Sequence, residues 1–230
     1  MKKIAVLTGA GISAESGIST FRDSDGLWEQ HNVMDVASIE GWYKNPKLVL
    51  DFYNERRKQL ETVEPNAAHK ILHELENHFN VCVITQNVDN LHERAGSTNI
   101  IHLHGELTKV RSIADEDTVY DIGYKAINIG DTDKSGVQLR PHIVWFGEAV
   151  PMLNAAADKV AQADIIAIIG TSLNVYPAAG LVNYKKNGIP VFLINPNDVN
   201  PFHIQNLTLI QEKATTGVEK MRNILIEKYL

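Results

Sequence analysis

The chain has 230 residues, of which 44% are hydrophobic and 22% are charged, so it is long enough to bury one large core. Its formal net charge of -6 argues against nucleic-acid binding, because a phosphate-binding groove needs clustered Lys and Arg. The only cysteine, Cys82, excludes an intramolecular disulfide and a zinc site made of cysteines. These properties indicate a folded protein of a reducing compartment.

An apolar run, Ile4–Leu7, follows the basic start of the chain and ends at Thr8-Gly9. This run is too short for the core of a signal peptide, so it predicts a buried first strand. No segment approaches the roughly 18 apolar residues that a membrane helix needs. We therefore expect a cytoplasmic protein with no membrane partner, present as a monomer or weak oligomer.

Short apolar, β-branched runs bounded by Gly, Asn or Pro alternate with segments of helical period along the chain. This βαβ order predicts an α/β fold: a Rossmann-like, mainly parallel sheet flanked by helices. The predicted strands cover residues 4–8, 81–86, 100–104, 143–146, 165–171, 191–195 and 207–210. The predicted helices cover residues 46–63, 66–79, 152–162, 177–186 and 216–229.

Two segments interrupt this alternation. Residues 106–139 are polar and carry turn signals at Gly130-Asp131 and at residues 134–136, which predicts a small inserted lobe. A second insert is expected over about 23–65, between the first strand and the next one. We expect residues 1–230 to form a single domain that includes both inserts.

A glycine-rich turn, Gly9-Ala10-Gly11, comes directly after the first predicted strand. Without β-carbons, backbone N–H groups at this position can approach a pyrophosphate at a helix N-terminus. The motif departs from GxGxxG, since Ala14 stands where the third glycine belongs. The motif alone leaves two interpretations open, a dinucleotide site and a tight strand-to-helix turn.

Small or amide residues follow three other predicted strands: residues 86–89, residues 170–172 and Asn195. Each could be an ordinary turn or cap, which these residue types favour. Ligands of open parallel sheets bind outside the carboxyl ends of the strands, and those ends meet at one edge. Their joint placement therefore predicts one ligand-binding crevice.

Two histidines, His102 and His104, are predicted to lie on the same face of a strand. They could form a metal site, or His104 alone could act as a base at the strand end, since its ordinary pKa lies near neutrality. Either residue could also be a core histidine. In a metal site, the further ligand would be Asp89, His92 or His142. Three other histidines fall on one predicted helix and are expected at the surface: His69, His73 and His78.

An arginine, Arg56, lies on the apolar stripe of the helix predicted over 46–63, with no acidic neighbour one turn away. By contrast, Arg57 has Glu61 four residues on, which predicts an ordinary surface pair. Arg56 could extend to solvent or pair with a distant carboxylate. Alternatively, with the hydroxyl of Tyr53 beside it, its guanidinium could bind a substrate carboxylate.

Seven motifs together resemble those of the sirtuin family, in the family's order and over nearly the whole chain. They occupy residues 9–13, 17–22, 85–89, 103–105, 146–148, 170–172 and 194–196. The resemblance implies an NAD-dependent protein-lysine deacylase that consumes NAD as a co-substrate. It implies NAD contacts from Gly9, Ala10, Gly11, Ser13, Phe21, Arg22, Gln86, Asn87, Asp89, Gly170, Thr171, Ser172, Asn195, Pro196, Asn197 and Ala214.

The resemblance also implies the catalytic roles. The acyl-lysine carbonyl oxygen attacks the ribose carbon as nicotinamide leaves, Asn87 takes part in catalysis, and His104 is the general base on a ribose hydroxyl. The products are free lysine and acyl-ADP-ribose. The acylated lysine would arrive on an extended peptide bound by Val144, Phe146, Gly147, Glu148 and Val175.

The stretch that contains Tyr53 and Arg56 is similar to the Tyr and Arg pair of desuccinylase-type sirtuins. This similarity implies that succinyl, malonyl or glutaryl lysine is a substrate, with acetyl lysine also accepted. Most sirtuins carry two cysteine pairs after the catalytic histidine, whereas residues 106–139 contain none, so we expect no zinc or other metal. Apolar packing would then hold the small lobe together, and its expected residues are Val119, Tyr120, Ile122 and Tyr124.

Two other functions use the same kind of pocket. An ADP-ribosyltransferase or an NADase differs from a deacylase only in the group that accepts the ribose, and Tyr53 with Arg56 favours the deacylase. A non-catalytic sensor of NAD or ADP-ribose is the second alternative. Asn87 and His104 argue against it, since binding of the adenosine half needs neither.

Overall fold

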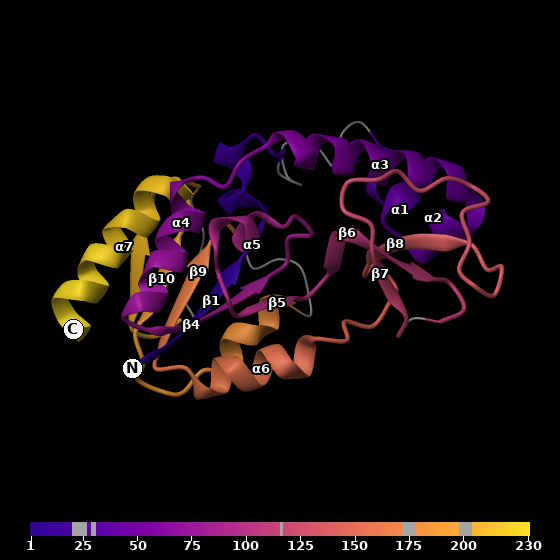
Figure 1. Ribbon diagram of the computed structural model, residues 1–230. Coiled ribbons are helices and arrows are strands. Elements are labelled where there is room, and N and C mark those ends of the chain that lie inside the picture. The colour runs from indigo at the N-terminus through magenta and orange to yellow at the C-terminus, as the bar shows by residue number, and fades with distance from the viewer. Residues whose placement is uncertain (20–26, 29–30, 116, 172–177, 198–203) are drawn as a thin grey trace.

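Six parallel strands form the central sheet of the protein, seen in the computed structural model of Figure 1. The structure describes residues 1–19, 27–28, 31–115, 117–171, 178–197 and 204–230. In spatial order the strands are β11 (Leu207–Ile210), β10 (Val191–Ile194), β9 (Ile165–Ile169), β1 (Lys3–Thr8), β4 (Asn80–Thr85) and β5 (Ile100–His102). The chain builds the sheet in both directions from β1, so a crevice is expected at the carboxyl end of this strand.

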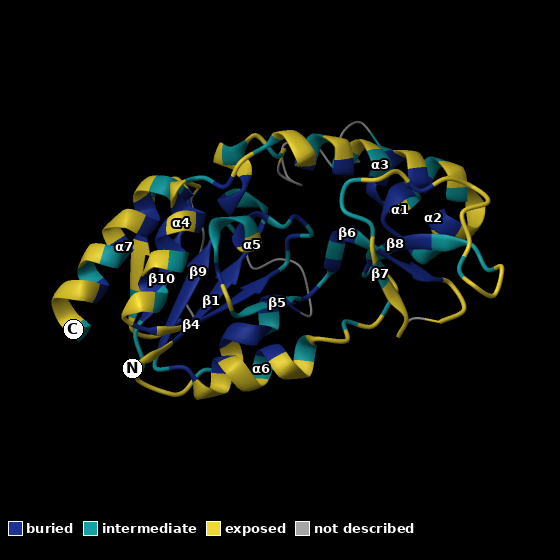
Figure 2. Ribbon diagram, viewed as in Figure 1, coloured by how far each residue is buried: buried dark blue, intermediate teal, exposed yellow. Residues whose placement is uncertain are grey.

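Helices cover both faces of the sheet (Figures 1 and 2). On one face, α4 (Ala67–Glu74) and α7 (Ala214–Tyr229) pack on a core that includes Val6, Phe192 and Met221. On the other face, α6 (Leu153–Gln162) and the 3-10 helix η4 (Ala178–Tyr184) cover a second core. The predicted doubly covered α/β sheet is therefore confirmed.

Several predicted boundaries are corrected by the structure. The helix predicted over 177–186 is a 3-10 helix within its described part, and the helix predicted over 66–79 divides into α4 and η3 (Leu75–Asn77). The helix predicted over 216–229 begins earlier, at Ala214. Short elements that the sequence pattern missed include η1 (Ala10–Ile12), η2 (Ala14–Ser16) and α5 (Leu91–Ala95).

A second, smaller lobe contains an antiparallel sheet of three strands in the order β7 (Val119–Asp121), β6 (Gly105–Ser112) and β8 (Leu139–Ile143). Strand β8 ends where the strand predicted over 143–146 should begin, which corrects that prediction. Helices α1 (Val33–Val36), α2 (Ile39–Lys44) and α3 (Pro46–Thr62) complete this lobe, and the short strands β2 (Leu27–Trp28) and β3 (His31–Asn32) precede them. Figure 1 shows α3 bridging the region between the two lobes.

The core of the small lobe joins the helical insert to the β-sheet insert. Apolar side chains from α1–α3 pack against β6, β8 and the chain that follows β8, and the cluster includes Leu50, Val110 and Trp145. Val119 is 37% exposed, so its predicted role in this core is wrong, whereas Tyr120, Ile122 and Tyr124 do pack at the edge of the core.

A buried ionic cluster also holds the small lobe together. The carboxylate of Glu148 lies 2.6 Å from Arg140 and 3.3 Å from Arg111, and both arginines are almost fully buried. Glu148 also accepts the backbone N–H of Trp145 at 2.7 Å, while the Arg140 guanidinium lies 3.4 Å from the Trp145 ring centre. Such a cluster cross-links β6, β8 and the chain that follows β8, because a buried charge is costly unless it is paired.

Two buried histidines lie behind the carboxyl end of β1. The rings of His69 and His92 are 4.8 Å apart, and both side chains are inaccessible to solvent, so the predicted surface position of His69 is wrong. Burial lowers the pKa of His69 to about 4 and the pKa of His92 well below its ordinary value. His92 Nε2 contacts the Thr8 hydroxyl at 3.2 Å, whereas neither ring nitrogen of His69 has a partner.

This histidine pair makes the fold acid-sensitive. Below pH 6.5, the unfolded chain binds protons at His69 that the folded chain refuses until about pH 4, so stability falls as the pH falls through this window. The expected loss is about 3 kcal/mol for His69. Urea unfolding of the wild type and of His69→Leu across this range measures it. The variant is expected to show the flatter pH dependence, and equal slopes would refute this origin.

Candidate active site

A cavity of about 700 Å³ lies at the carboxyl ends of the sheet strands and extends to the small lobe. This volume is in the range of cofactor and small-molecule sites. Its lining comes from the turns after β1, β4, β9 and β10, from α3, and from the chain after β8. All the predicted site residues that the structure describes line it, namely Gly9, Ala10, Gly11, Ser13, Tyr53, Arg56, Gln86, Asn87, Asp89, His104, Val144, Phe146, Gly147, Glu148, Gly170, Thr171, Asn195, Pro196, Asn197 and Ala214.

Four predicted site residues lie outside the described residues: Phe21, Arg22, Ser172 and Val175. Other lining residues were not predicted, among them Leu107, Trp145 and Val150. Trp145 lies between two predicted substrate residues, Val144 and Phe146, so its neighbours were the only available signal. Leu107 and Val150 have no local signal, because they reach the cavity through tertiary folding.

The glycine-rich turn after β1 packs directly against the turn after β9. Gly11 N–H donates to the Gly170 carbonyl oxygen at 2.9 Å. A β-carbon on Gly11 would lie 2.7 Å from Gly170 Cα, and one on Gly9 would lie 2.7 Å from Thr171 Cβ. Only glycine allows this approach, which leaves a backbone-lined cradle suited to a pyrophosphate.

Replacement of Gly170 by alanine is expected to damage this cradle. Gly170 has a φ of 62°, and an added β-carbon would lie 2.4 Å from the Ile12 backbone nitrogen. A strained left-handed residue costs about 1–3 kcal/mol, and relief of the clash must move the turn that carries Gly11. We expect weaker NAD binding in calorimetric titration and a lower unfolding midpoint. Gly188→Ala is the matched control, since it also has a positive φ but meets no atom within 4 Å.

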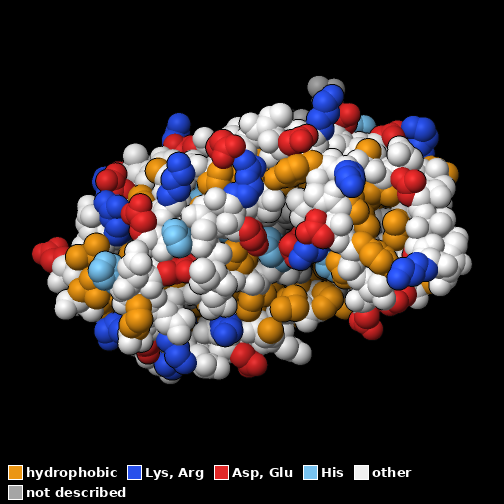
Figure 3. Space-filling model, in the orientation of Figure 1, with side chains coloured by type: hydrophobic (Ala, Val, Ile, Leu, Met, Phe, Trp, Pro, Cys, Tyr) orange, Lys and Arg blue, Asp and Glu red, His pale blue; other side chains and the backbone are white. Residues whose placement is uncertain are grey.

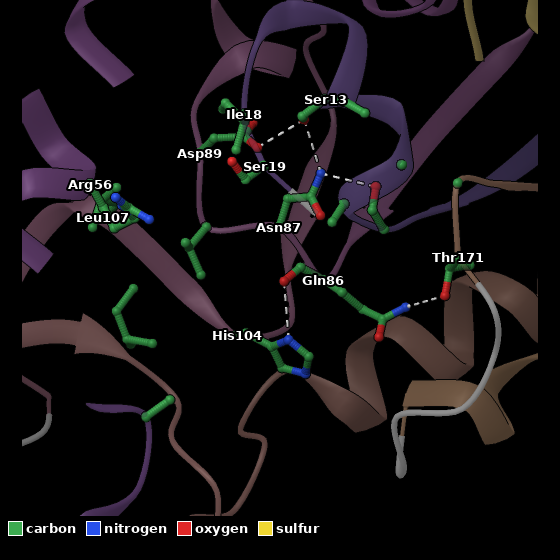
Figure 4. A pocket seen from close by; sticks show the side chains of 18 of the residues that line it. Ser13, Ile18, Ser19, Arg56, Gln86, Asn87, Asp89, His104, Leu107 and Thr171 are labelled. Atoms are coloured by element: carbon green, nitrogen blue, oxygen red, sulfur yellow. Dashed lines mark hydrogen bonds between the residues drawn. The ribbon is translucent and has the colours of Figure 1, made fainter. Parts of the chain in front are cut away.

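Three polar side chains form a connected network beside the glycine turn (Figure 4). The Ser13 hydroxyl donates to Asp89 Oδ2 at 2.9 Å, and the Asn87 amide nitrogen lies 3.2 Å from both Ser13 Oγ and the Gly9 carbonyl oxygen. All three side chains are almost fully buried. Burial raises the pKa of Asp89, against the hydrogen bonds from Leu91 N–H and Ser13 that lower it. The network therefore fixes the Asn87 amide at the wall of the cavity.

His104 is oriented by a backbone carbonyl. Its Nδ1 lies 3.0 Å from the Gln86 carbonyl oxygen, as Figure 4 shows. Because a carbonyl only accepts hydrogen bonds, Nδ1 carries the proton and Nε2 keeps its lone pair. Burial lowers the pKa of His104, although the contact with Gln86 raises it. His104 is thus a neutral imidazole with a basic nitrogen available near neutral pH.

The structure does not support a metal site shared by His102 and His104. His102 Nε2 lies 2.6 Å from Glu93 Oε1. Within the described part of the chain, one group of potential ligands converges, Glu93 with His102 and Glu106, and it contains none of the other ligands considered from the sequence. His104 instead lines the cavity.

The small-lobe side of the cavity carries the aromatic and cationic residues. The Tyr53 hydroxyl accepts a hydrogen bond from Trp145 Nε1 at 3.0 Å, and burial raises the pKa of Tyr53, which therefore stays protonated. The Arg56 guanidinium lies 5.3 Å from the Phe52 ring centre. Figure 4 shows Arg56 beside Leu107, apart from the group of Ser13, Asn87 and Asp89. The cavity thus has a polar end at the sheet and a cationic end at the small lobe.

Arg57 differs from its prediction as a surface residue. It is fully buried, donates from Nε to the Leu107 carbonyl oxygen at 2.8 Å, and contacts Asn54 Oδ1 at 2.6 Å. Burial lowers the pKa of Arg57 to about 10. Arg57 therefore ties α3 to β6, while its neighbour Arg56 lines the cavity.

A glycine cradle and a fixed amide network at the carboxyl ends of a parallel sheet define a dinucleotide-binding α/β protein with a second lobe over the site. The family model described as "Sir2 family" matches residues 9–177. The chain belongs to the Sir2, or sirtuin, family. A Helicobacter pylori protein named NAD-dependent protein deacylase is 56% identical over 227 residues, which covers 99% of both chains. A Bacteroides thetaiotaomicron protein of the same name is 54% identical and covers 98% of this chain and 99% of its own.

Solved structures of the family are similar to this one over nearly all of its length. A Sir2 homologue in complex with NAD superposes with a TM-score of 0.87 at 39% identity, over 98% of this chain and 90% of that one. A Sir2 complex with a p53 peptide and NAD+ has a TM-score of 0.78 at 30% identity, over 98% and 92% of the two chains. Both similarities extend over the sheet and the small lobe together.

Proposed function

We propose that this protein is an NAD-dependent protein-lysine deacylase whose cavity joins an NAD site at the sheet to an acyl-lysine site under the small lobe. One observation carries the proposal: a neutral histidine with a free Nε2, His104, lies in the same cavity as the glycine cradle and the Asn87 network. Relatives more than half identical over the full chain carry this activity in their names, which supports the same assignment.

NAD would supply a ribose carbon that becomes electrophilic when nicotinamide departs. Gly9, Gly11 and Gly170 would hold its pyrophosphate with backbone groups. The Asn87 amide and Asp89 would surround the ribose with oriented dipoles and exclude competing water. Asn195, whose amide donates to the Thr171 carbonyl oxygen at 3.1 Å, would contact the adenosine half together with its neighbours Pro196 and Asn197.

The role proposed for His104 is to accept a proton from a ribose hydroxyl through Nε2. The lowered pKa keeps the imidazole neutral at the pH where this step is needed. The carbonyl of Gln86 holds the ring so that the resulting imidazolium is stabilised by a hydrogen bond at Nδ1. Outward transfer of this proton completes the step and returns the base to its starting form.

We further propose that acidic acyl groups are substrates. Arg56 offers a planar set of N–H donors at the small-lobe end of the cavity, and such a fork suits a carboxylate. Tyr53, fixed by Trp145 and protonated, lies on the same helix one turn earlier. A succinyl, malonyl or glutaryl chain ends in the carboxylate that Arg56 would bind, whereas an acetyl group ends before it.

The peptide that carries the lysine would lie along residues 144–148. Phe146 is 41% exposed and lines the cavity beside Gly147. The Glu148 carboxylate is already engaged by Arg140 and Arg111, so we assign the peptide contact to the backbone of this segment rather than to that side chain. A bound strand at this place would extend the short bridge that Phe146 makes with Ser38.

The remaining expectations concern partners and location. Acidic and basic side chains are mixed over the face shown in Figure 3, as expected for a protein that does not bind nucleic acid. In the described part of the chain, no helix has the length and apolar character needed to cross a membrane. We propose a cytoplasmic, zinc-free enzyme that acts as a monomer or weak oligomer on acylated proteins.

Mass spectrometry of the products tests the proposed function. Purified protein is incubated with acetyl- or succinyl-lysine peptides, with and without NAD, and the acyl group is followed. A deacylase transfers it to ADP-ribose. ADP-ribose attached to the peptide would indicate a transferase, free ADP-ribose with an unchanged peptide would indicate an NADase, and no change in NAD would indicate a sensor.

A further inference from the structure

The segment after β4 carries the Asn87 network. Groups of residues 102–107 contact four consecutive backbone carbonyls there, those of residues 85–88. Leu103 N–H donates to the Thr85 carbonyl oxygen at 2.9 Å, and Leu107 N–H donates to that of Val88 at 2.8 Å. Between them, the Gln86 carbonyl contacts His104 Nδ1 at 3.0 Å. The Asn87 carbonyl contacts the ring of His102, with Nδ1 at 3.3 Å.

The ring of His102 is placed between two groups that accept hydrogen bonds. Its Nδ1 faces the Asn87 carbonyl oxygen, and its Nε2 lies 2.6 Å from Glu93 Oε1. A carbonyl and a carboxylate both need a donor, so both ring nitrogens carry protons and the ring is an imidazolium. Burial lowers the pKa of His102, but Glu93, Glu106 and the Asn87 carbonyl together outweigh burial and raise the pKa above its ordinary value. Glu93 lies on α5, which begins at Leu91, two residues after Asp89.

The charges around His102 are balanced without a metal ion. Glu106 lies close to Glu93 and His102, and Lys109 pairs with Glu106 at 2.7 Å. The four side chains therefore comprise two anions and two cations. A divalent ion would have to displace Lys109 and the proton on Nε2, so this cluster fits an ion-pair network better than a metal site.

We propose that His102 is a positioning residue, which Glu93 orients so that Nδ1–H holds the Asn87 carbonyl and thereby aims the Asn87 amide at the reacting ribose. This inference rests on the proposed deacylase function. The backbone carbonyl of Asn87 contacts the ring of His102, while the side-chain amide of Asn87 contacts Gly9 and Ser13. Loss of either contact lets the residue rotate, and small displacements of a group at a reacting centre lower the rate strongly.

Two substitutions separate the contacts of His102. In His102→Asn, the side-chain N–H₂ takes the place of Nδ1, so the donor to Asn87 is kept and Glu93 loses its partner. In His102→Gln, the N–H₂ reaches the place of Nε2, so the contact with Glu93 is kept and the Asn87 carbonyl loses its donor. His78→Gln, which replaces an exposed histidine, is the matched control.

The steady-state kinetics of these variants, with NAD and an acyl-lysine peptide, test the inference. We expect His102→Gln to lower kcat on the order of tenfold to a hundredfold with a smaller change in KM for NAD. We expect His102→Asn to recover most of this loss, although its thermal midpoint falls more than that of His102→Gln. The opposite order of kcat, or equal losses in both, would overturn the positioning role.

A second readout does not depend on turnover. Amide hydrogen exchange over residues 85–91, followed by mass spectrometry, is expected to be faster in His102→Gln than in the wild type and His102→Asn. An unchanged exchange pattern would overturn the inference. If exchange over residues 85–91 is faster in His102→Gln as expected, but the wild type removes no acyl group, the proposed function fails while the positioning of Asn87 by His102 stands.

Discussion

Replacement of His104 by alanine is expected to lower kcat for NAD-dependent deacylation on the order of a hundredfold to ten-thousandfold. His104 is the one histidine in the described lining of the cavity; burial keeps its imidazole neutral, and the Gln86 carbonyl orients the ring. Its removal takes away the proton acceptor but no buried ion pair. Initial rates of lysine release by mass spectrometry, with saturating NAD, measure the effect.

The control for this substitution is His78→Ala, which removes an exposed histidine that does not line the cavity. The wild-type pH profile adds a second check. A protonated base is inactive, so the rate falls as the pH falls through the pKa of His104, and the lowered pKa places this fall below about pH 6.5. A His104→Ala enzyme that retains most of its rate would contradict the assigned base.

Replacement of Arg56 by methionine is expected to reduce kcat/KM for succinyl-lysine by about 30-fold relative to acetyl-lysine. A lost Arg–carboxylate contact costs about 2–5 kcal/mol when desolvated. Arg56 is only partly buried, so we expect a cost near the lower limit of this range. Methionine keeps the length and apolar contact of the side chain with Phe52. The measurement is a pair of kcat/KM values on otherwise identical peptides.

The variant Arg56→Lys separates charge from geometry in this test. It retains the positive charge but cannot form two parallel hydrogen bonds to a carboxylate, so an intermediate selectivity is expected. Arg222→Met, on the part of α7 that does not line the cavity, is the control for loss of an arginine. Equal losses of kcat/KM on acetyl- and succinyl-lysine in Arg56→Met would contradict the proposal that acidic acyl groups are substrates.

The cavity at the sheet could be predicted from the sequence because the fold class fixes where strand ends meet. Gly9, Gln86, Gly170 and Asn195 are far apart in the chain, yet each follows a buried parallel strand, and all four line one cavity. Periodicity identified those strands, and the parallel order placed their carboxyl ends together. The family resemblance then added the chemistry that periodicity does not contain.

The buried charged and polar side chains could not be predicted in this way. Arg57 was assigned to the surface because Glu61 lies four residues on, and His69 because it falls on a helix predicted to be polar. Arg57 finds its partners in the Leu107 carbonyl and Asn54, and His69 is buried as a neutral ring against His92. The contacts of Arg57 with Leu107 and of His69 with His92 join segments distant in the chain and leave no periodic signal, and the same holds for the pairing of β6 with β8.

In the proposed reaction every NAD cleavage removes one acyl group, so the stoichiometry of the products reports on this coupling. Nicotinamide and free lysine are quantified together while the wild type acts on a succinyl-lysine peptide. We expect equal amounts of both products, with the acyl group recovered on ADP-ribose. Nicotinamide released without lysine, or lysine released without NAD, would contradict it.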